Sequence, residues 1–177
     1  MSVLVASEAW AEKCPTTPDD ATCRPWSAVL LPTAYGGMFA PKEGPMFYGG
    51  GVEAIWLLWS DNSEAFGPSQ GRLRSTVGVY TGEDDAGTLV MWRTGAQVGF
   101  ERNASRQFLI PYFAADFGGF HSDGTGRRWF VDGGLGLYVL HRRSLILDVE
   151  VTGVLPFRQA DQLGGVTSRL ALSFALW

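Results

Sequence analysis

The stretch GTLVMWRTGAQVGFE, residues 87–101, alternates between two kinds of side chain and decides the fold class. One face of an extended strand would carry the apolar residues Val90, Trp92, Ala96, Val98 and Phe100. The opposite face would carry Arg93, Gly95, Gln97, Gly99 and Glu101. A repeat of two residues is typical of a β-strand with one apolar face, whereas a helix repeats about every 3.6 residues. The stretch therefore predicts a strand.

The same alternation recurs along the chain and predicts eight strands. Their expected ranges are 27–40, 45–60, 70–82, 87–101, 107–121, 128–140, 145–157 and 165–177. Segments rich in Gly, Asp, Asn and Ser separate them, as turns require. The 23 glycines also favour an all-β chain, because an interior glycine costs a helix about 1 kcal/mol relative to alanine.

The composition of the polar face indicates what each face meets. No lysine follows Lys42, although lysine is common on strand faces that contact water. Sparse arginines and carboxylates separated by glycine and serine suit the inside of a narrow barrel, where long charged side chains must pair with each other. The apolar face would then contact lipid. We therefore predict a closed, eight-stranded, antiparallel up-and-down transmembrane barrel.

Length and composition bound the domain organisation. The 177 residues are 46% hydrophobic and 18% charged, which excludes disorder. The net charge of -4 and the lack of a basic face argue against a nucleic-acid partner. We expect residues 27–177 to form the barrel domain. Residues 1–26, which hold an A-x-A pattern at 9–11 and several prolines, would be a signal-peptide remnant and a periplasmic tail.

The two cysteines lie close together in this tail. Cys14 and Cys23 enclose a short loop rich in Pro, Thr and Asp, and a disulfide between them would indicate an oxidising compartment. A pair of free thiols is the alternative. The C-x8-C spacing fits no common zinc site, and neither histidine is near. No metal or cofactor is expected.

The predicted barrel resembles the small eight-stranded outer-membrane β-barrel proteins of Gram-negative bacteria. The resemblance covers about residues 27–177 and rests on the even strand number, the two-residue repeat and the ending SRLALSFALW. The terminal Trp177 is similar to the aromatic residue that such proteins present to the barrel-assembly machinery. The resemblance implies a place in the bacterial outer membrane, with membrane lipid and the assembly machinery as partners. In a structural or adhesive role, the loops or the tail would contact another envelope protein.

Aromatic residues near the predicted strand ends are expected to form the girdles at the membrane surfaces. They are Trp59, Tyr80, Phe100, Phe120, Trp129, Phe157 and Trp177. The two histidines, His121 and His141, lie at predicted turns, where we expect them to be solvated.

Register predicts a charged cluster in the lumen. Counting across the short turn after residue 101 places Arg93 opposite Asp116, and counting across the next turn places Asp116 opposite Asp132. Two carboxylates would then share one arginine, so a proton or a further arginine is needed. The candidates for that arginine are Arg74 and Arg169.

The expected function is a non-enzymatic structural, adhesive or envelope-interaction role, because eight strands enclose a volume that side chains fill. One alternative is a soluble lipocalin-like barrel that binds an apolar ligand, which requires the aliphatic face to point inward. The other is a lipid-modifying barrel enzyme. His121, Ser122 and Asp123 have the residue types of such a site, but consecutive strand residues point to opposite faces.

Overall fold

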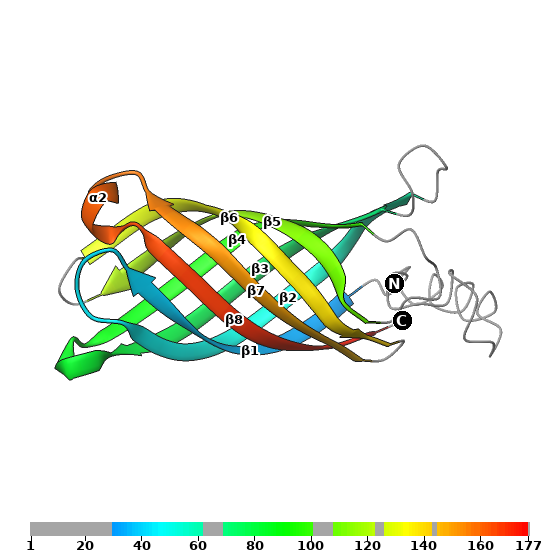
Figure 1. The fold of residues 1–177 in the computed structure, drawn as a ribbon, viewed down its shortest axis with the longest axis horizontal. Helices are drawn as coiled ribbons and strands as arrows, with labels where there is room; N and C mark the ends of the chain where they lie inside the picture. The colour runs from blue at the N-terminus through cyan, green and yellow to red at the C-terminus, as the bar shows by residue number, and fades with distance from the viewer. Residues whose placement is uncertain (1–29, 62–68, 101–107, 123–125, 143–144, 177) are drawn as a thin grey trace, which may run out of the picture.

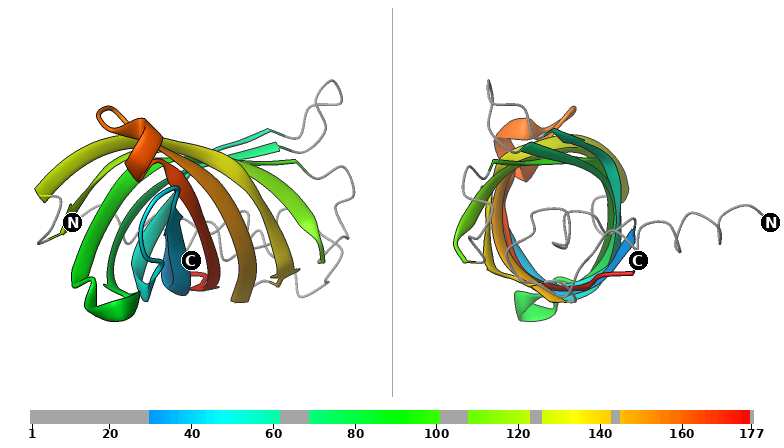
Figure 2. Two further views of the ribbon diagram at one scale, coloured as in Figure 1. Left: turned by 60° about the vertical axis from the view of Figure 1, so that its left-hand side comes forward. Right: turned by 90° about the vertical axis from the view of Figure 1, so that its right-hand side faces the viewer.

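The computed structural model describes residues 30–61, 69–100, 108–122, 126–142 and 145–176. Eight strands form one closed barrel in chain order (Figure 1). They are β1 (Leu30–Pro41), β2 (Phe47–Asp61), β3 (Ser69–Gly82), β4 (Thr88–Phe100), β5 (Ile110–Ser122), β6 (Gly126–His141), β7 (Leu145–Pro156) and β8 (Gly165–Phe174). Every neighbouring pair is antiparallel, including β1 with β8. The predicted all-β up-and-down barrel is confirmed, and the right panel of Figure 2 shows the closed ring.

The barrel has two distinct ends. At one end β1 begins and β8 ends, and Leu30 forms a bridge with Leu176. We call this the terminal end and the opposite one the far end. Two short helices lie in connections of the far end, η3 (Glu83–Asp85) and α2 (Ala160–Leu163).

Burial alternates along the strands because successive side chains point to opposite faces. Arg74 is 0% exposed, whereas its neighbour Leu73 is 43% exposed. The same contrast holds on β7, where Glu150 is 2% and Val151 is 54% exposed. Charged residues therefore face the lumen and aliphatic residues face outward, which is the reverse of a soluble barrel.

The lumen is filled in three layers. Buried hydrophobic residues occupy the terminal end, and we call them the terminal plug: Leu31, Ile55, Ile110, Tyr112, Ala114, Tyr138 and Ile146. A second group, the far plug, extends to the other end: Tyr35, Phe39, Tyr80, Leu89, Met91, Phe120, Phe130, Val154 and Ala171, of which Ala171 lies nearest the terminal end. The layer between the plugs is polar. Ile110 of the terminal plug and Phe130 of the far plug are 0% exposed.

Two of the expected girdle residues belong to the far plug instead. Tyr80 is 3% and Phe120 is 2% exposed, so their prediction as outward girdle residues is wrong. Their strand parity places them inward, where large rings fill the end of the lumen. Phe100, Trp129 and Phe157 do lie exposed on the outer surface. The side chains of Trp59 and Trp177 lie outside the described residues.

The histidines also differ from each other. His121 is exposed, as expected. His141 is 1% exposed and is the last residue of β6, with its ring centroid 5.2 Å from that of Tyr138. Its prediction as a solvated turn residue is therefore wrong, because β6 extends through position 141.

The N-terminal predictions fall on residues that are not described. Cys14, Cys23 and the expected tail 1–26 all precede Leu30, where the described chain begins. The disulfide and the domain boundary therefore stay predictions. Within the described ranges, no helix has the length and apolar character needed to cross a membrane.

Candidate functional site

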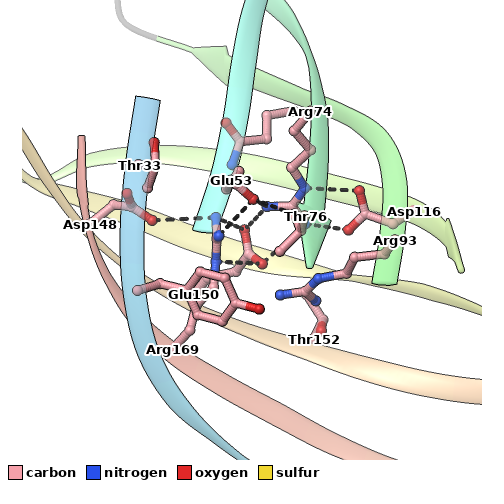
Figure 3. Close-up of polar contacts among 12 residues, drawn as sticks. Thr33, Glu53, Arg74, Thr76, Arg93, Asp116, Asp148, Glu150, Thr152 and Arg169 are labelled. Carbon is pink, nitrogen blue, oxygen red and sulfur yellow. Dashed lines mark hydrogen bonds and ion pairs between the residues drawn. The ribbon is translucent and has the colours of Figure 1, made fainter. Parts of the chain in front are cut away.

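A network of charged and hydroxyl side chains fills the middle of the barrel (Figure 3). We call it the lumen network. Every strand from β2 to β8 supplies a charged member: Glu53 on β2, Arg74 on β3, Arg93 on β4, Asp116 on β5, Asp132 on β6, Asp148 and Glu150 on β7, and Arg169 on β8. None of these residues is more than 6% exposed. The network thus lies between the two plugs, out of contact with water.

Arg74 is the centre of the network. Its Nε donates to Asp116 Oδ1 at 2.8 Å, and its Nη2 donates to Asp116 Oδ2. On its other side Nη1 donates to Glu150 Oε2 at 2.6 Å. Arg74 therefore binds two carboxylates in the forked geometry that makes arginine–carboxylate bonds strong and directional. It links β3 to β5 and β7.

A glycine lets Arg74 reach across a strand. Gly95 on β4 lies opposite Arg74 on one side and opposite Asp116 on the other. A side chain at Gly95 would overlap the Asp116 carboxylate and the Ala115 carbonyl. The absence of a side chain there leaves the space through which the guanidinium bonds to Asp116. Small residues on the polar face thus make room for long charged ones, as the sequence predicts.

Arg169 connects β8 to β2 and β7. Its Nη1 donates to Glu53 Oε2 at 2.8 Å, and its Nε lies 3.1 Å from Glu150 Oε1. Arg169 and Glu150 are also cross-strand partners. Thr76 donates its hydroxyl to the same Glu53 oxygen at 2.7 Å. Arg169 thereby links β8, which closes the barrel against β1, to β2 and β7. Thr76 links β3 to the same carboxylate on β2.

The three predicted cluster residues, Arg93, Asp116 and Asp132, all lie inside the barrel. Asp116 pairs with Asp132 across β5 and β6, as the register count places it. The register between β4 and β5 was wrong by two residues, because Arg93 lies opposite Gly118. Arg93 instead donates to Asp132 Oδ2 at 3.2 Å.

The principal partners of this cluster were not predicted from the sequence. Arg74, named there only as a candidate, is the residue that binds Asp116. Glu53, Asp148 and Glu150 were not assigned to it. Asp148 and Glu150 stand at alternate positions of their strand, which was the available signal. The bonds from Arg74 to Asp116 and Glu150 span strands that are not neighbours, and register counting between adjacent strands does not detect such contacts.

Hydroxyl groups complete the polar layer. Tyr112 donates to Asp148 Oδ1 at 2.7 Å, and its ring packs over Gly136, its cross-strand partner. Thr152 and Thr167 share a hydrogen bond of 2.6 Å between their hydroxyls. These contacts join the network to the terminal plug and to β8.

The lumen holds more acid than base. Its buried carboxyl groups are Glu53, Asp116, Asp132, Asp148 and Glu150, and its buried guanidinium groups are Arg72, Arg74, Arg93 and Arg169. With every group ionised, the lumen would carry one net negative charge. Buried charges are stable only when they are paired and hydrogen-bonded. The carboxylates therefore depend on shared arginines, as Arg74 shows by binding both Asp116 and Glu150.

The charged groups of the lumen network are buried and are not exposed to a substrate in solution. The acidic and basic groups of the lumen bond to one another between the two plugs. Of the triad considered from the sequence, His121 points outward, Ser122 is 6% exposed on the inward side, and Asp123 is outside the described residues. Within the described ranges, no group of three His, Cys, Asp or Glu side chains is placed to hold a metal ion.

Comparison with known proteins finds the fold but no sequence family. Neither a family model nor a curated protein sequence matches the chain. Among solved structures, the N-terminal β-barrel domain of Pseudomonas aeruginosa OprF is similar, with 18% identity, a TM-score of 0.57, and coverage of 83% of this chain and 96% of that one. The outer membrane enzyme PagL is also similar, with 14% identity, a TM-score of 0.52, and coverage of 82% and 99%. The chain shares their barrel fold.

Proposed function

We propose that the protein is an integral barrel of the Gram-negative outer membrane that serves a structural, lipid-contacting role in the envelope and has no enzymatic or pore activity. One observation carries this proposal: the barrel is apolar outside and charged inside. An outward surface of Leu, Val, Phe and Trp suits lipid, and closure leaves no strand edge without hydrogen-bond partners. The similarity to PagL, an outer membrane enzyme, supports the location.

The filled lumen argues against transport. A diffusion pathway along the axis would have to pass both plugs and the lumen network, whose Arg74 is 0% exposed. Barrels of eight strands are narrow enough for side chains to fill them. The envelope role therefore rests on the outer surface and the rims.

Short connections favour a structural role over adhesion. The longest connection between strands runs only from Phe100 to Ile110. Adhesive contacts need loops that project beyond the lipid headgroups, and these connections supply few residues for that purpose. An envelope protein partner would have to contact the rims or the tail.

The two alternatives receive less support. A lipocalin-like barrel needs an apolar inner face, whereas the middle of this lumen holds the charged network. A lipid-modifying enzyme needs reactive groups together on the surface, and His121 has Val90 and Arg127 as its cross-strand neighbours.

Membrane insertion and the closed lumen can be tested together. The folded protein in detergent should migrate differently on a gel before and after boiling, because a fully paired barrel resists the detergent. Reconstituted into a planar lipid bilayer, it should add no steady conductance. Identical migration with helical circular dichroism would refute the barrel in lipid, and a stable open channel would refute the closed lumen.

The tail prediction has its own test. Cys14 and Cys23 in exported protein should resist thiol labelling until a reductant is added. Labelling of both without reductant would reject the disulfide.

A further inference from the structure

Basic side chains gather on part of the far-end rim. His121 on β5 and Arg127 on β6 are cross-strand partners, and both are exposed. Arg158, also exposed, follows Phe157 just beyond β7. Among the described residues, no carboxylate forms an ion pair with Arg127 or Arg158. Among the described residues, this part of the rim therefore presents positive charge that no carboxylate pairs.

The other described part of the far-end rim holds more acid than base. Lys42 and Glu43 lie between β1 and β2, and Glu83, Asp84 and Asp85 form η3 between β3 and β4. Asp123 and the side chain of Asp161 lie outside the described set. Among the described side chains the β5–β7 side of the rim is thus the more basic one, which favours an anionic group there.

An aromatic cluster lies directly below the basic rim on the outer surface. The Trp92 and Trp129 rings are 5.1 Å apart, and Phe117 stacks on Trp129 at 5.4 Å. Phe157 joins the cluster at 6.1 Å from Phe117, and its backbone N–H donates to the Trp129 carbonyl at 3.0 Å. Tryptophan prefers the level of the lipid headgroups. The cluster therefore places Arg127 and Arg158 at the height of lipid phosphates.

An apolar depression lies farther down the same surface. Its volume is about 480 Å³. Small residues and larger ones line it together: Ala96, Ala115 and Gly134 with Val98, Phe113 and Leu135. Ala115 is six residues from His121 on β5, which corresponds to about 20 Å along the strand. With a tilt of about 40° the depth is about 15 Å, and this is half of a hydrocarbon core of about 30 Å.

We propose that the outer surface of β4–β7 at the far end binds one membrane lipid with a phosphate-bearing anionic headgroup. Arg127, Arg158 and His121 contact the phosphate, and an acyl chain passes the aromatic cluster into the depression. The charge of the rim selects the headgroup. The depression lies at a depth that the acyl chain of the same lipid reaches. This inference rests on the proposed function, because the surface must face a membrane.

Brominated lipids provide the test, since bromine quenches tryptophan on contact. The protein is reconstituted into phosphatidylcholine vesicles with a small fraction of phosphatidic acid, and the bromine is placed on either lipid in matched samples. Trp92 and Trp129 should be quenched more by brominated phosphatidic acid than by brominated phosphatidylcholine at the same fraction. The Arg127→Gln and Arg158→Gln variants should each lower the relative affinity for phosphatidic acid roughly fivefold.

Matched variants separate charge from shape. Arg142→Gln removes an exposed arginine at the terminal end and should leave the preference unchanged. Ala115→Leu fills the depression and should weaken the preference while the rim charges remain. Equal loss in Arg142→Gln, or no loss in Ala115→Leu, would overturn the proposed site.

Three further outcomes would overturn the inference. Equal quenching by the two lipids in the parent protein would show no selectivity. Loss of the preference in excess inorganic phosphate would indicate a site for free phosphate. Cross-linking of two copies through this face would indicate self-association. Failure of the parent protein to insert, seen as unchanged gel migration on boiling, would instead refute the proposed function.

Discussion

The inner and outer faces of the same strands follow opposite rules. At the adjacent positions Arg74 and Leu73, the inward arginine bonds to Asp116 and Glu150, whereas the outward leucine contacts no lumen group and is 43% exposed. The inner face is specific because each charge needs a particular partner at a particular distance. In the proposed membrane location the outer face is tolerant, because lipid accepts any apolar side chain. Stability should therefore depend strongly on inner residues and weakly on outer ones.

The largest contrast is expected between Arg74→Met and Leu73→Met. Arg74→Met leaves the Asp116 and Glu150 carboxylates without their main partner, and breaking a buried ion pair costs about 3–5 kcal/mol. Leu73→Met changes one apolar side chain for another and should cost less than about 1.5 kcal/mol. Urea unfolding of both variants in lipid vesicles measures the two free energies. Equal losses would contradict the distinction between the faces.

A smaller contrast is expected between two glycines. At Gly136 a methyl group would overlap the Tyr112 ring, so Gly136→Ala should destabilise the barrel by about 1–3 kcal/mol. At the outward Gly153 the nearest atom to such a group is the Gly133 carbonyl oxygen, 3.9 Å away. Gly153→Ala should leave stability unchanged or raise it by up to about 1 kcal/mol. The same unfolding assay decides, and a destabilised Gly153→Ala would argue against an open outer surface.

The smallest contrast is between two hydroxyl pairs. Thr152→Val removes the inner hydrogen bond to Thr167 and should cost about 1 kcal/mol. Ser75→Ala removes the outer contact with the Thr94 hydroxyl, 3.1 Å in length, and should cost about 0.6 kcal/mol. A double-mutant cycle for each pair measures the coupling. A stronger outer coupling would reverse the expected order.

The sequence predicted the inside and outside of the strands better than the partners within the lumen. Alternation places Arg93, Asp116 and Asp132 on the inner face, and the structure has them there. A register error of two residues keeps every side chain on its face, which is why Arg93 stays inside although its cross-strand partner is Gly118 rather than Asp116. The error arose because the connection from Phe100 to Ile110 is longer than the assumed turn.

Contacts across the lumen could not be predicted by the same reasoning. Arg74 bonds to residues on β5 and β7, which are not neighbours of β3. Such bonds depend on barrel diameter and on the space left by Gly95. Likewise, Tyr80 and Phe120 fill one end of the lumen, and alternation alone does not tell a ring in a plug from a ring in a girdle.

We infer that the apolar face of the strands contacts lipid and that the charged face does not. Photolabelling with a hydrophobic diazirine dissolved in the vesicle membrane, followed by mass spectrometry of the labelled residues, tests it most directly. The label should alternate along β3 and β7, marking Leu73, Val77, Val149 and Val151 and sparing Arg74, Thr76, Asp148 and Glu150. Labelling of the charged residues, or no label on either strand, would contradict the account.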